Sequence, residues 1–393
     1  MFKKTTLAST ICMALFGQCV YAADEAAEQT QNAQANDNND SLEIIEVVGI
    51  RSSLNKAVNI KRQSIQVVDA IVAEDIGKFP DNNLVEALQR VTGVQVTDRA
   101  SGEVNTVTIR GLTDVTTTIN GREMFTAAGR QLAVADIPAA LLESVEVYKT
   151  RNASQLASGI AGQLNVRTQR PFNFEGSKVV VNARGVYQDQ SEETDPRLSA
   201  LTSYTNDDRT FGFLVSASFS SQLISNIGAD TGRWEDDSFC TDDSCLGTQS
   251  EDLSSYWHPR FPRFADKSHE LDRTGLTASI QFAPTEDTTV TVDALYAKIE
   301  AQRLEPFMQA ISLARTNSLG VGQTYLTDYT IDGNDSIVAA TAHDVDVRSE
   351  NFESNWESEF TQFSVDVVHH INDDLKLHLL AGTSESVLDN RET

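Results

Sequence analysis

The chain has 393 residues, of which 40% are hydrophobic and 7% aromatic, and it carries a formal charge of −26. This length accommodates two domains, and the apolar content is sufficient for ordered cores, which excludes global disorder. Nucleic acid is excluded as a partner because a polyanion would be repelled and no basic patch offsets the charge.

Residues 1–22 have the pattern of a signal peptide. Two lysines precede a short apolar run from Leu7 to Phe16, and Val20 to Ala22 fits a cleavage site. The apolar run is far shorter than the ~20 residues that a membrane-spanning helix needs. Cys19 allows a lipoprotein signal as an alternative, although Gln18 stands where a small residue should precede the lipidated cysteine. We therefore expect an exported protein.

Two cysteines remain after cleavage, in the sequence CTDDSC. In an exported protein, Cys240 and Cys245 are predicted to form a local disulfide. A metal site with Asp242 and Asp243 is the alternative, but it lacks a second pair of ligands. The surrounding acidic cluster also lacks a complete calcium-loop spacing, so a solvated surface is the simpler interpretation. We expect no metal and no cofactor.

Residues 23–63 are predicted to be a disordered spacer that contains one short extended segment. Asp24 to Ser41 is rich in Gln, Asn, Asp and Ala, with little that a core could bury. Glu43 to Gly49 is β-branched and apolar, and reads either as the first strand of the next domain or as a strand offered to a partner protein. Arg51 to Gln63 reads as a polar linker.

Residues 64–171 read as a compact α+β unit. One helix is predicted to begin near Asp81 and to end at Gly93, and a second to begin at Asp136. Small residues from Ser158 to Gly162 allow backbones to approach closely, and Pro171 ends the last strand. Strands are predicted at 94–96, 106–109, 116–119, 145–148 and 163–168, with a hairpin-type turn at Asn120-Gly121.

Residues 172–393 contain seven segments in which apolar residues alternate with polar ones. Their apolar registers begin at Val179, Leu198, Phe211, Leu276, Val290, Phe363 and Leu375. Such alternation fits a soluble sandwich or a membrane barrel. No stretch after the signal peptide is apolar enough for a membrane helix, so a membrane location requires a closed barrel.

The connections favour a barrel. Tight turns are predicted at 206–209, 284–287 and 372–374, and they alternate with long polar stretches at 188–197, 223–267 and 302–357. Such parity is typical of membrane barrels, whose two ends carry turns of different length. Seven strands is an odd number, and the tail from Asp389 to Thr393 is polar, so we predict no closing strand and a barrel that continues beyond Thr393.

Taken together, these motifs resemble a TonB-dependent outer-membrane receptor. EIIEVVG looks like a TonB box, and the resemblance continues through IGKFPDNNLVEALQRVTGVQV, VTIRGL, TTINGR, LLESVEVYKT and ASGIAGQLNVRTQRP. The run GIRSSLNKA is similar to a proteobacterial subgroup linked to carbohydrate uptake. The resemblance implies an α+β plug domain followed by the first strands of a transmembrane antiparallel β-barrel, which is 22-stranded in that family. One departure is Ala161-Gly162-Gln163, where relatives often carry paired glycines.

The resemblance also implies partners and a site. The TonB C-terminal domain, driven by a proton-powered inner-membrane complex, would pair with the box as an added strand and pull on the plug. An oligosaccharide or a siderophore would then pass through a barrel surrounded by outer-membrane lipid. The box residues would be Glu43, Ile44, Ile45, Glu46, Val47, Val48 and Gly49. Ligand contacts at the plug apex would involve Arg110, Thr113, Asp114, Arg122, Glu123, Met124 and Phe125.

Several alternatives remain open. Arg110 and Arg122 either contact the ligand or form structural ion pairs. Arg167 and Arg170 are expected to anchor the plug to the barrel. The aromatic residues of the 223–267 stretch either stack on sugars or pack this loop against itself: Trp234, Tyr256, Trp257, Phe261 and Phe264. A passive outer-membrane porin or adhesin would need neither box nor plug. A secreted hydrolase would need a catalytic motif, and GxSxG and HExxH are missing, so no enzyme is expected.

Overall fold

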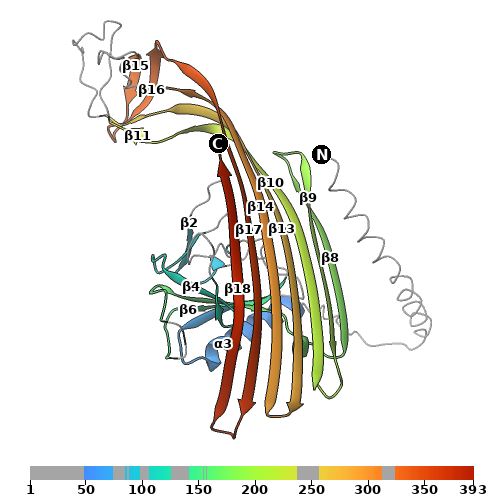
Figure 1. Cartoon of the computed structure of the whole chain (residues 1–393). Coiled ribbons are helices and arrows are strands. Elements are labelled where there is room, and N and C mark those ends of the chain that lie inside the picture. The colour runs from blue at the N-terminus through green and yellow to red at the C-terminus, as the bar shows by residue number, and fades with distance from the viewer. Residues whose placement is uncertain are drawn as a thin grey trace, which may run out of the picture. The chain divides into compact units, whose positions relative to one another are not determined.

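A computed structural model describes residues 48–73, 85, 88–97, 106–124, 141–153, 155, 157–236, 256–311 and 324–393. All of them belong to one compact unit that extends from Val48 to Thr393. The unit contains two larger β-sheets, which we call the plug sheet and the barrel sheet (Figure 1).

The plug sheet has five strands in the order β1-β6-β7-β4-β5. Strands β4 and β7 pair in parallel, and the other pairs are antiparallel. A separate hairpin joins β2 (Val94–Thr97) to β3 (Thr106–Ile109). The plug-sheet strands are β1 (Val68–Val72), β4 (Val115–Ile119), β5 (Arg122–Glu123), β6 (Leu142–Tyr148) and β7 (Gly162–Thr168).

The strands predicted between residues 94 and 168 are all present, and the predicted turn joins β4 to β5. Asn120 and Gly121 both adopt positive φ angles there, of 49° and 84°, as this class of hairpin turn requires. Val85 and Leu88 are helical and fully buried, in agreement with the first predicted helix. The predicted start of the second helix, at Asp136, lies outside the described residues.

The stretch expected to be a polar linker is helical instead. Helix α3 spans Val48–Gln63 and packs against β1, where the Ser53 hydroxyl donates to the Val72 carbonyl oxygen over 3.0 Å. After Gly49 the segment has no glycine or proline, and Lys61 and Arg62 in its last turn favour the negative end of the helix dipole. Its charged residues made it look like a linker, although lysine and arginine are good helix formers.

The barrel sheet has seven antiparallel strands in the order β18-β17-β14-β13-β10-β9-β8. Each strand pairs with its neighbours in the chain order of these seven, so the number of strands expected from the sequence is confirmed. The strands are β8 (Ser177–Gln188), β9 (Glu193–Thr205), β10 (Phe211–Thr231), β13 (Pro262–Thr285), β14 (Thr288–Ala310), β17 (Val347–His370) and β18 (Lys376–Glu392).

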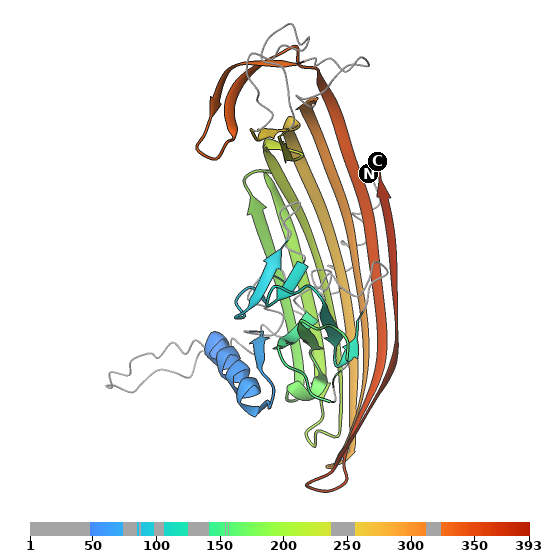
Figure 2. The same ribbon diagram turned by 90° about the vertical axis from the view of Figure 1, so that its left-hand side faces the viewer.

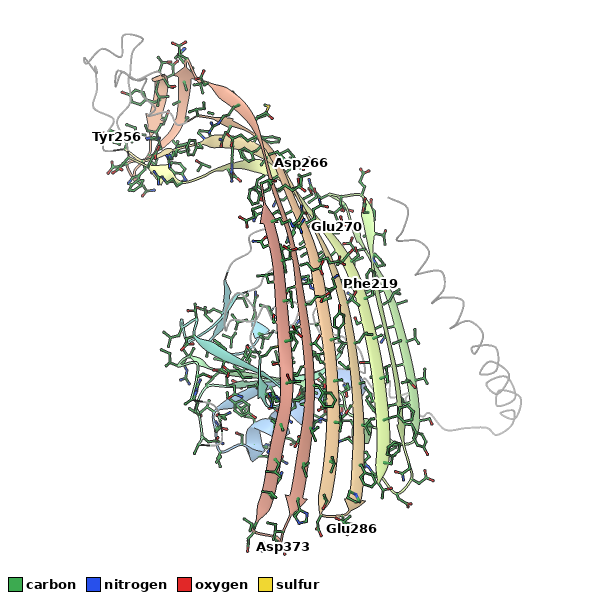
Figure 3. All side chains as sticks on the ribbon, in the orientation of Figure 1. Phe219, Tyr256, Asp266, Glu270, Glu286 and Asp373 are labelled. Carbon is green, nitrogen blue, oxygen red and sulfur yellow. The ribbon has the colours of Figure 1, made fainter. Side chains whose placement is uncertain are left out.

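The three predicted tight turns are present at one end of the sheet, where Figure 3 labels Glu286 and Asp373. Two predictions about the other end are wrong. The connection between β8 and β9 is short, because the strands extend to Gln188 and Glu193. The polar tail is a strand, since β18 continues to Glu392 and its Arg391 pairs with Asn355.

Much of the two remaining polar stretches is also strand. They contain the ends of β10, β13, β14 and β17 that lie farthest from the tight turns, together with two small ribbons beyond the barrel sheet. One ribbon pairs β11 (Trp234–Glu235) with β12 (His258–Pro259). The other pairs β15 (Tyr325–Ile331) with β16 (Ile337–His343).

The main core lies between the plug sheet and the barrel sheet. It gathers plug residues such as Ile109, Ile119 and Val145 with Leu295 of β14 and Phe360 of β17. Figure 2 shows the plug strands against one face of the barrel sheet. The two sheets therefore share one hydrophobic core, in which the barrel sheet supplies two of the buried side chains.

Candidate functional site: the contact between plug and barrel sheet

The two faces of the barrel sheet differ in polarity. On β10, Phe211, Phe213 and Val215 point away from the plug and are exposed, whereas Ser216 and Ser218 point toward it and are buried. An apolar outer face with a polar inner face is the reverse of a soluble protein, and it is the alternation of a membrane barrel.

The apolar band on the outer face ends at different heights on different strands. One row across the sheet consists of Phe219 on β10, Thr274 on β13, Lys298 on β14 and Glu359 on β17. This row is apolar on β10 and charged on β17, so the band shifts along the strands from one side of the sheet to the other. Strands that are tilted in a membrane require such a shift. Farther along β13, the outer register continues as Glu270 and Asp266 (Figure 3).

Arg170 joins the plug to the barrel sheet. Its Nη2 atom lies 2.6 Å from Asp293 Oδ2 on β14, and its Nη1 atom lies 3.5 Å from Asp366 Oδ2 on β17. Ser279 donates to the second oxygen of Asp293 over 2.7 Å, and His378 Nε2 lies 2.7 Å from Asp366 Oδ1. The prediction that Arg170 anchors the plug to the barrel agrees with this geometry.

Main-chain groups of the plug make further contacts with polar side chains of the sheet. The Phe172 amide donates to Gln281 Oε1 over 2.8 Å, and Gln362 Nε2 donates to the Ile119 carbonyl over 3.4 Å. At the short 3₁₀ turn η4 (Pro171–Asn173), the Thr205 hydroxyl donates to the Pro171 carbonyl over 2.8 Å. The polar inner face of the barrel sheet thus satisfies plug backbone groups that would otherwise be buried without partners.

Arg167 does not anchor the plug, contrary to the sequence-based expectation. It pairs with Glu146 inside the plug sheet, with its Nε atom 2.8 Å from Glu146 Oε1. Asn165 and Tyr148 donate to the other oxygen, over 3.0 and 2.8 Å. Burial opposes ionisation of Glu146, but Arg167 and these hydrogen bonds outweigh it and hold the pKa of this carboxyl below its usual value.

Two of the predicted ligand residues, Asp114 and Glu123, contact a loop within the plug. The Ile160 amide donates to Asp114 Oδ2 over 3.0 Å, and Ser158 Oγ donates to Glu123 Oε1 over 3.3 Å. Thr113 is exposed in the same turn as Asp114. The loop is tightly fitted, because a Cβ atom added to Gly159 would lie 2.4 Å from Thr116 Oγ1. This fit explains the run of small residues noted in the sequence.

The other predicted ligand residues have diverse environments. Arg110 is exposed in a turn with a φ angle of 54°, and no ion pair joins it to another described residue. Arg122 Nη2 donates to the Gly382 carbonyl of β18 over 2.9 Å. Met124 is only 1% exposed and belongs to the main core, which leaves it no surface for a ligand in this conformation. Phe125 lies outside the described residues.

The remaining predicted sites fall mostly outside the described part of the chain. This holds for the signal peptide, for residues 43–47 of the predicted box, and for Cys240 and Cys245. Val48 and Gly49 are the first two residues of helix α3. Strand addition at these two positions therefore requires that the first turn of α3 unwinds.

Asp293 and Asp366 were missed as site residues, although the sequence carries a signal for them. Each is the one acidic residue in the inward register of an otherwise apolar and hydroxylated segment, TVDAL and SVDVV. An isolated acid inside a strand predicted to be half-buried indicates a basic partner.

Neither a metal centre nor a helical span is found in the described part of the chain. No three His, Cys, Asp or Glu side chains among these residues are grouped so that they could hold a metal ion. In the same residues, no helix is both long and apolar enough to cross a membrane, a finding that does not bear on β-barrels.

A comparison with protein families matches residues 60–163 to the TonB-dependent Receptor Plug Domain. The chain therefore carries the plug domain of a TonB-dependent receptor, and the family predicted from the sequence is confirmed. The fold class, a plug followed by strands of an antiparallel barrel, is confirmed as well. No match is found among curated proteins.

A comparison with solved structures finds similarity to two outer-membrane receptors and a ferric citrate transporter. The alcaligin receptor FauA from Bordetella pertussis matches with 10% identity and a TM-score of 0.36, over 84% of this chain and 57% of that one. The ferripyoverdine receptor of Pseudomonas aeruginosa matches with 11% identity and a TM-score of 0.37, over 84% and 44%. The ferric citrate transporter FecA matches with 13% identity and a TM-score of 0.32, over 85% and 60%. The chain thus spans less than two thirds of these proteins.

Proposed function

We propose that this chain is the plug and the first part of the barrel of a receptor that imports a scarce ligand across the outer membrane. In this proposal the energy comes from TonB, whose C-terminal domain adds Glu43–Gly49 to its own sheet as a strand. The protein binds and moves its cargo and is not an enzyme. Export through the signal peptide, and a disulfide between Cys240 and Cys245, belong to the same proposal.

The observation that carries the proposal is the attachment of the plug. A plug domain is matched at residues 60–163, and Arg170 holds it to two carboxylates on the inner face of the barrel sheet. A passive porin or adhesin, the alternative function, has no use for a domain attached to its lumen by a charge pair. An ion pair can be broken and remade without covalent change, as a cycle of plug movement requires.

A carbohydrate is the favoured cargo, and a siderophore is the alternative. The GIRSSLNKA run supports the carbohydrate, while the names of the similar solved structures refer to siderophores and ferric citrate. Growth of a deletion strain on single carbon sources and single iron sources separates the two: a defect confined to one carbon source identifies a sugar, and a defect confined to one iron source identifies a chelate.

The docking step is tested by the substitution Val47→Pro in the full chain. Proline removes a backbone donor and blocks strand pairing, so co-purification with the TonB C-terminal domain and ligand-dependent growth should both be lost. Val47→Ala is the matched control, since it keeps the backbone donor and should retain both. Uptake that survives Val47→Pro would contradict docking at this segment.

A further inference from the structure

Two exposed tryptophans stand on one face of the β11–β12 ribbon. Trp234 pairs with Pro259 across the ribbon, and Glu235 pairs with His258. Because side chains alternate along a strand, Trp257 shares the face of Pro259 and Trp234. Trp234 and Trp257 are 48% and 45% exposed, whereas Glu235 and His258 on the opposite face are buried. The rings occupy diagonal positions, roughly 7 Å apart between backbones.

The backbone beneath these rings is fixed on two sides. Glu235 lies 3.3 Å from both Arg233 and Arg260, so one buried carboxylate holds the two ends of the ribbon together. The Trp257 amide donates to the Asp335 carbonyl, and the Trp257 carbonyl accepts from the Ile337 amide, both over 2.8 Å. The ribbon backbone is therefore pinned to the start of β16, which lowers the cost of ordering it when a ligand arrives.

Two of the other aromatic side chains of this region pack against the protein itself. Tyr256 packs against the small core of Leu326 and Ile337 (Figure 3). Phe261 lies under the Arg260 guanidinium, 4.5 Å from its ring centroid. Self-packing, one of the two sequence-based interpretations, thus describes Tyr256 and Phe261. Trp234, Trp257 and Phe264 remain exposed, and Phe264 lies on strand β13, outside the ribbon.

The charge of the surroundings selects among ligands. The described residues of the two connections, 232–236, 256–261, 311 and 324–346, contain seven acidic residues and two basic ones. An anionic chelate would be repelled at such a surface, whereas a neutral molecule would not. A pyranose ring with equatorial hydroxyls has an apolar C–H face that covers an aromatic ring, and its edge hydroxyls remain free to bond with water or protein.

We infer that Trp234 and Trp257 form a stacking platform for neutral, β-linked oligosaccharides. The inference rests on the proposed import function and deepens it, because it assigns the class of cargo and a site of first capture. This site lies on the β11–β12 ribbon and not among the plug residues predicted from the sequence. Two exposed rings on one face of the ribbon suit the extended shape of a β-1,4-linked glucan, and cellohexaose serves as the probe.

The test uses intrinsic fluorescence of the full chain in detergent. The chain has three tryptophans, and the third, Trp356, packs against the cluster of Leu271 and Ile299, so a Trp356→Phe variant reports on the platform alone. Cellohexaose should shift its emission to shorter wavelength in a saturable manner, and ferric citrate should not. Calorimetry then compares the wild-type chain with single variants. Cellohexaose should bind at least tenfold more weakly to W234A and to W257A than to the wild type, and nearly normally to W234F and W257F.

Two results would overturn the inference: no response to cellohexaose, or equal affinity in a W234A/W257A double variant. The phenylalanine variants control for a folding defect, because phenylalanine preserves stacking and side-chain volume better than alanine does. Binding in detergent needs no TonB, so Val47→Pro should bind cellohexaose normally. Sugar binding without TonB-dependent uptake would contradict only the proposed function, and TonB-dependent uptake without sugar binding would contradict only the platform.

Discussion

Arg170 of the plug and Asp293 of strand β14 form an ion pair of 2.6 Å across the contact between the two sheets. The Asp293 side chain is 8% exposed, and it also accepts a hydrogen bond from Ser279. At this degree of burial, an ionised carboxylate destabilises the fold unless a cation pairs with it. The pair therefore controls how firmly the last plug strand, β7, is held to the barrel sheet.

Replacement of Arg170 by Gln should loosen β7. The change leaves the Asp293 charge buried without its cation, which costs about 3 kcal/mol at such pairs. Hydrogen exchange at the Thr168 amide, which donates to Asn120 Oδ1 over 3.1 Å, should accelerate accordingly. Arg391→Gln on β18 is the control, because Arg391 is 79% exposed and its pair with Asp389 contributes little. Equal exchange rates in the two variants would contradict the role of Arg170.

Gly159→Ala should prevent the plug loop from closing on β4. Gly159 has a φ angle of 72°, and an added Cβ would lie 2.5 Å from the Thr116 backbone nitrogen. The left-handed conformation alone costs about 1 kcal/mol, and the overlap with a strand backbone adds to it. Limited proteolysis near Ser158 should therefore become faster. Gly333→Ala is the matched control, since its new methyl group meets nothing within 4 Å, and it should behave like the wild type.

The sequence predicted the strands of the barrel sheet better than their lengths. Outside the apolar band both faces of a strand can be polar, as at His269 on the inner face and Glu270 on the outer face of β13. The period-two signal then disappears, although the backbone ladder continues from Pro262 to Thr285. Hydrophobic alternation therefore marks the segment that faces lipid, and the rest of each strand was taken for loop.

The predicted site residues show a second limit of prediction from sequence. Arg170 was expected to be an anchor, yet Arg167, three residues earlier, received the same prediction and pairs with Glu146 instead. The two arginines have similar sequence surroundings, and only the fold decides which one points to β14. Met124 illustrates the same point, because its place just after the NGR motif suggested a ligand contact, whereas its side chain fills the core.

Acid should weaken the plug through Glu146. Its pKa in the folded protein lies below the usual value, so ionised Glu146 stabilises the plug above the ordinary pKa of a glutamate. That stabilisation is lost as the pH falls through the depressed pKa. A Glu146→Gln variant should show a smaller loss of stability upon acidification, measured as hydrogen exchange of β6 amides at several pH values. A pH dependence identical to the wild type would show that other carboxylates control this response.

Asp69 should fix β1, the first plug strand, to the segment that follows β6. It lies between Lys149 and Lys61, at 2.5 and 2.6 Å, and burial is outweighed by these two lysines, so its pKa lies below the usual value. Asp69→Asn should weaken the attachment of β1 to the segment after β6 by about 2 kcal/mol, the scale of a hydrogen bond to a charged group. Lys149 is the more important partner because its side chain is 8% exposed, compared with 61% for Lys61.

A mechanical test follows, since α3 begins within the last two residues of the predicted box. A pull on residues 43–49 reaches α3 first and then β1, which the Asp69–Lys149 pair holds to the plug. In single-molecule pulling on the N-terminus, Asp69→Asn should lower the force at which β1 detaches, while Lys61→Gln, which removes only the exposed pair to α3, should change it little. A detachment force that stays unchanged in Asp69→Asn would mean that the pairing of β1 with β6, and not the ion pair, bears the load.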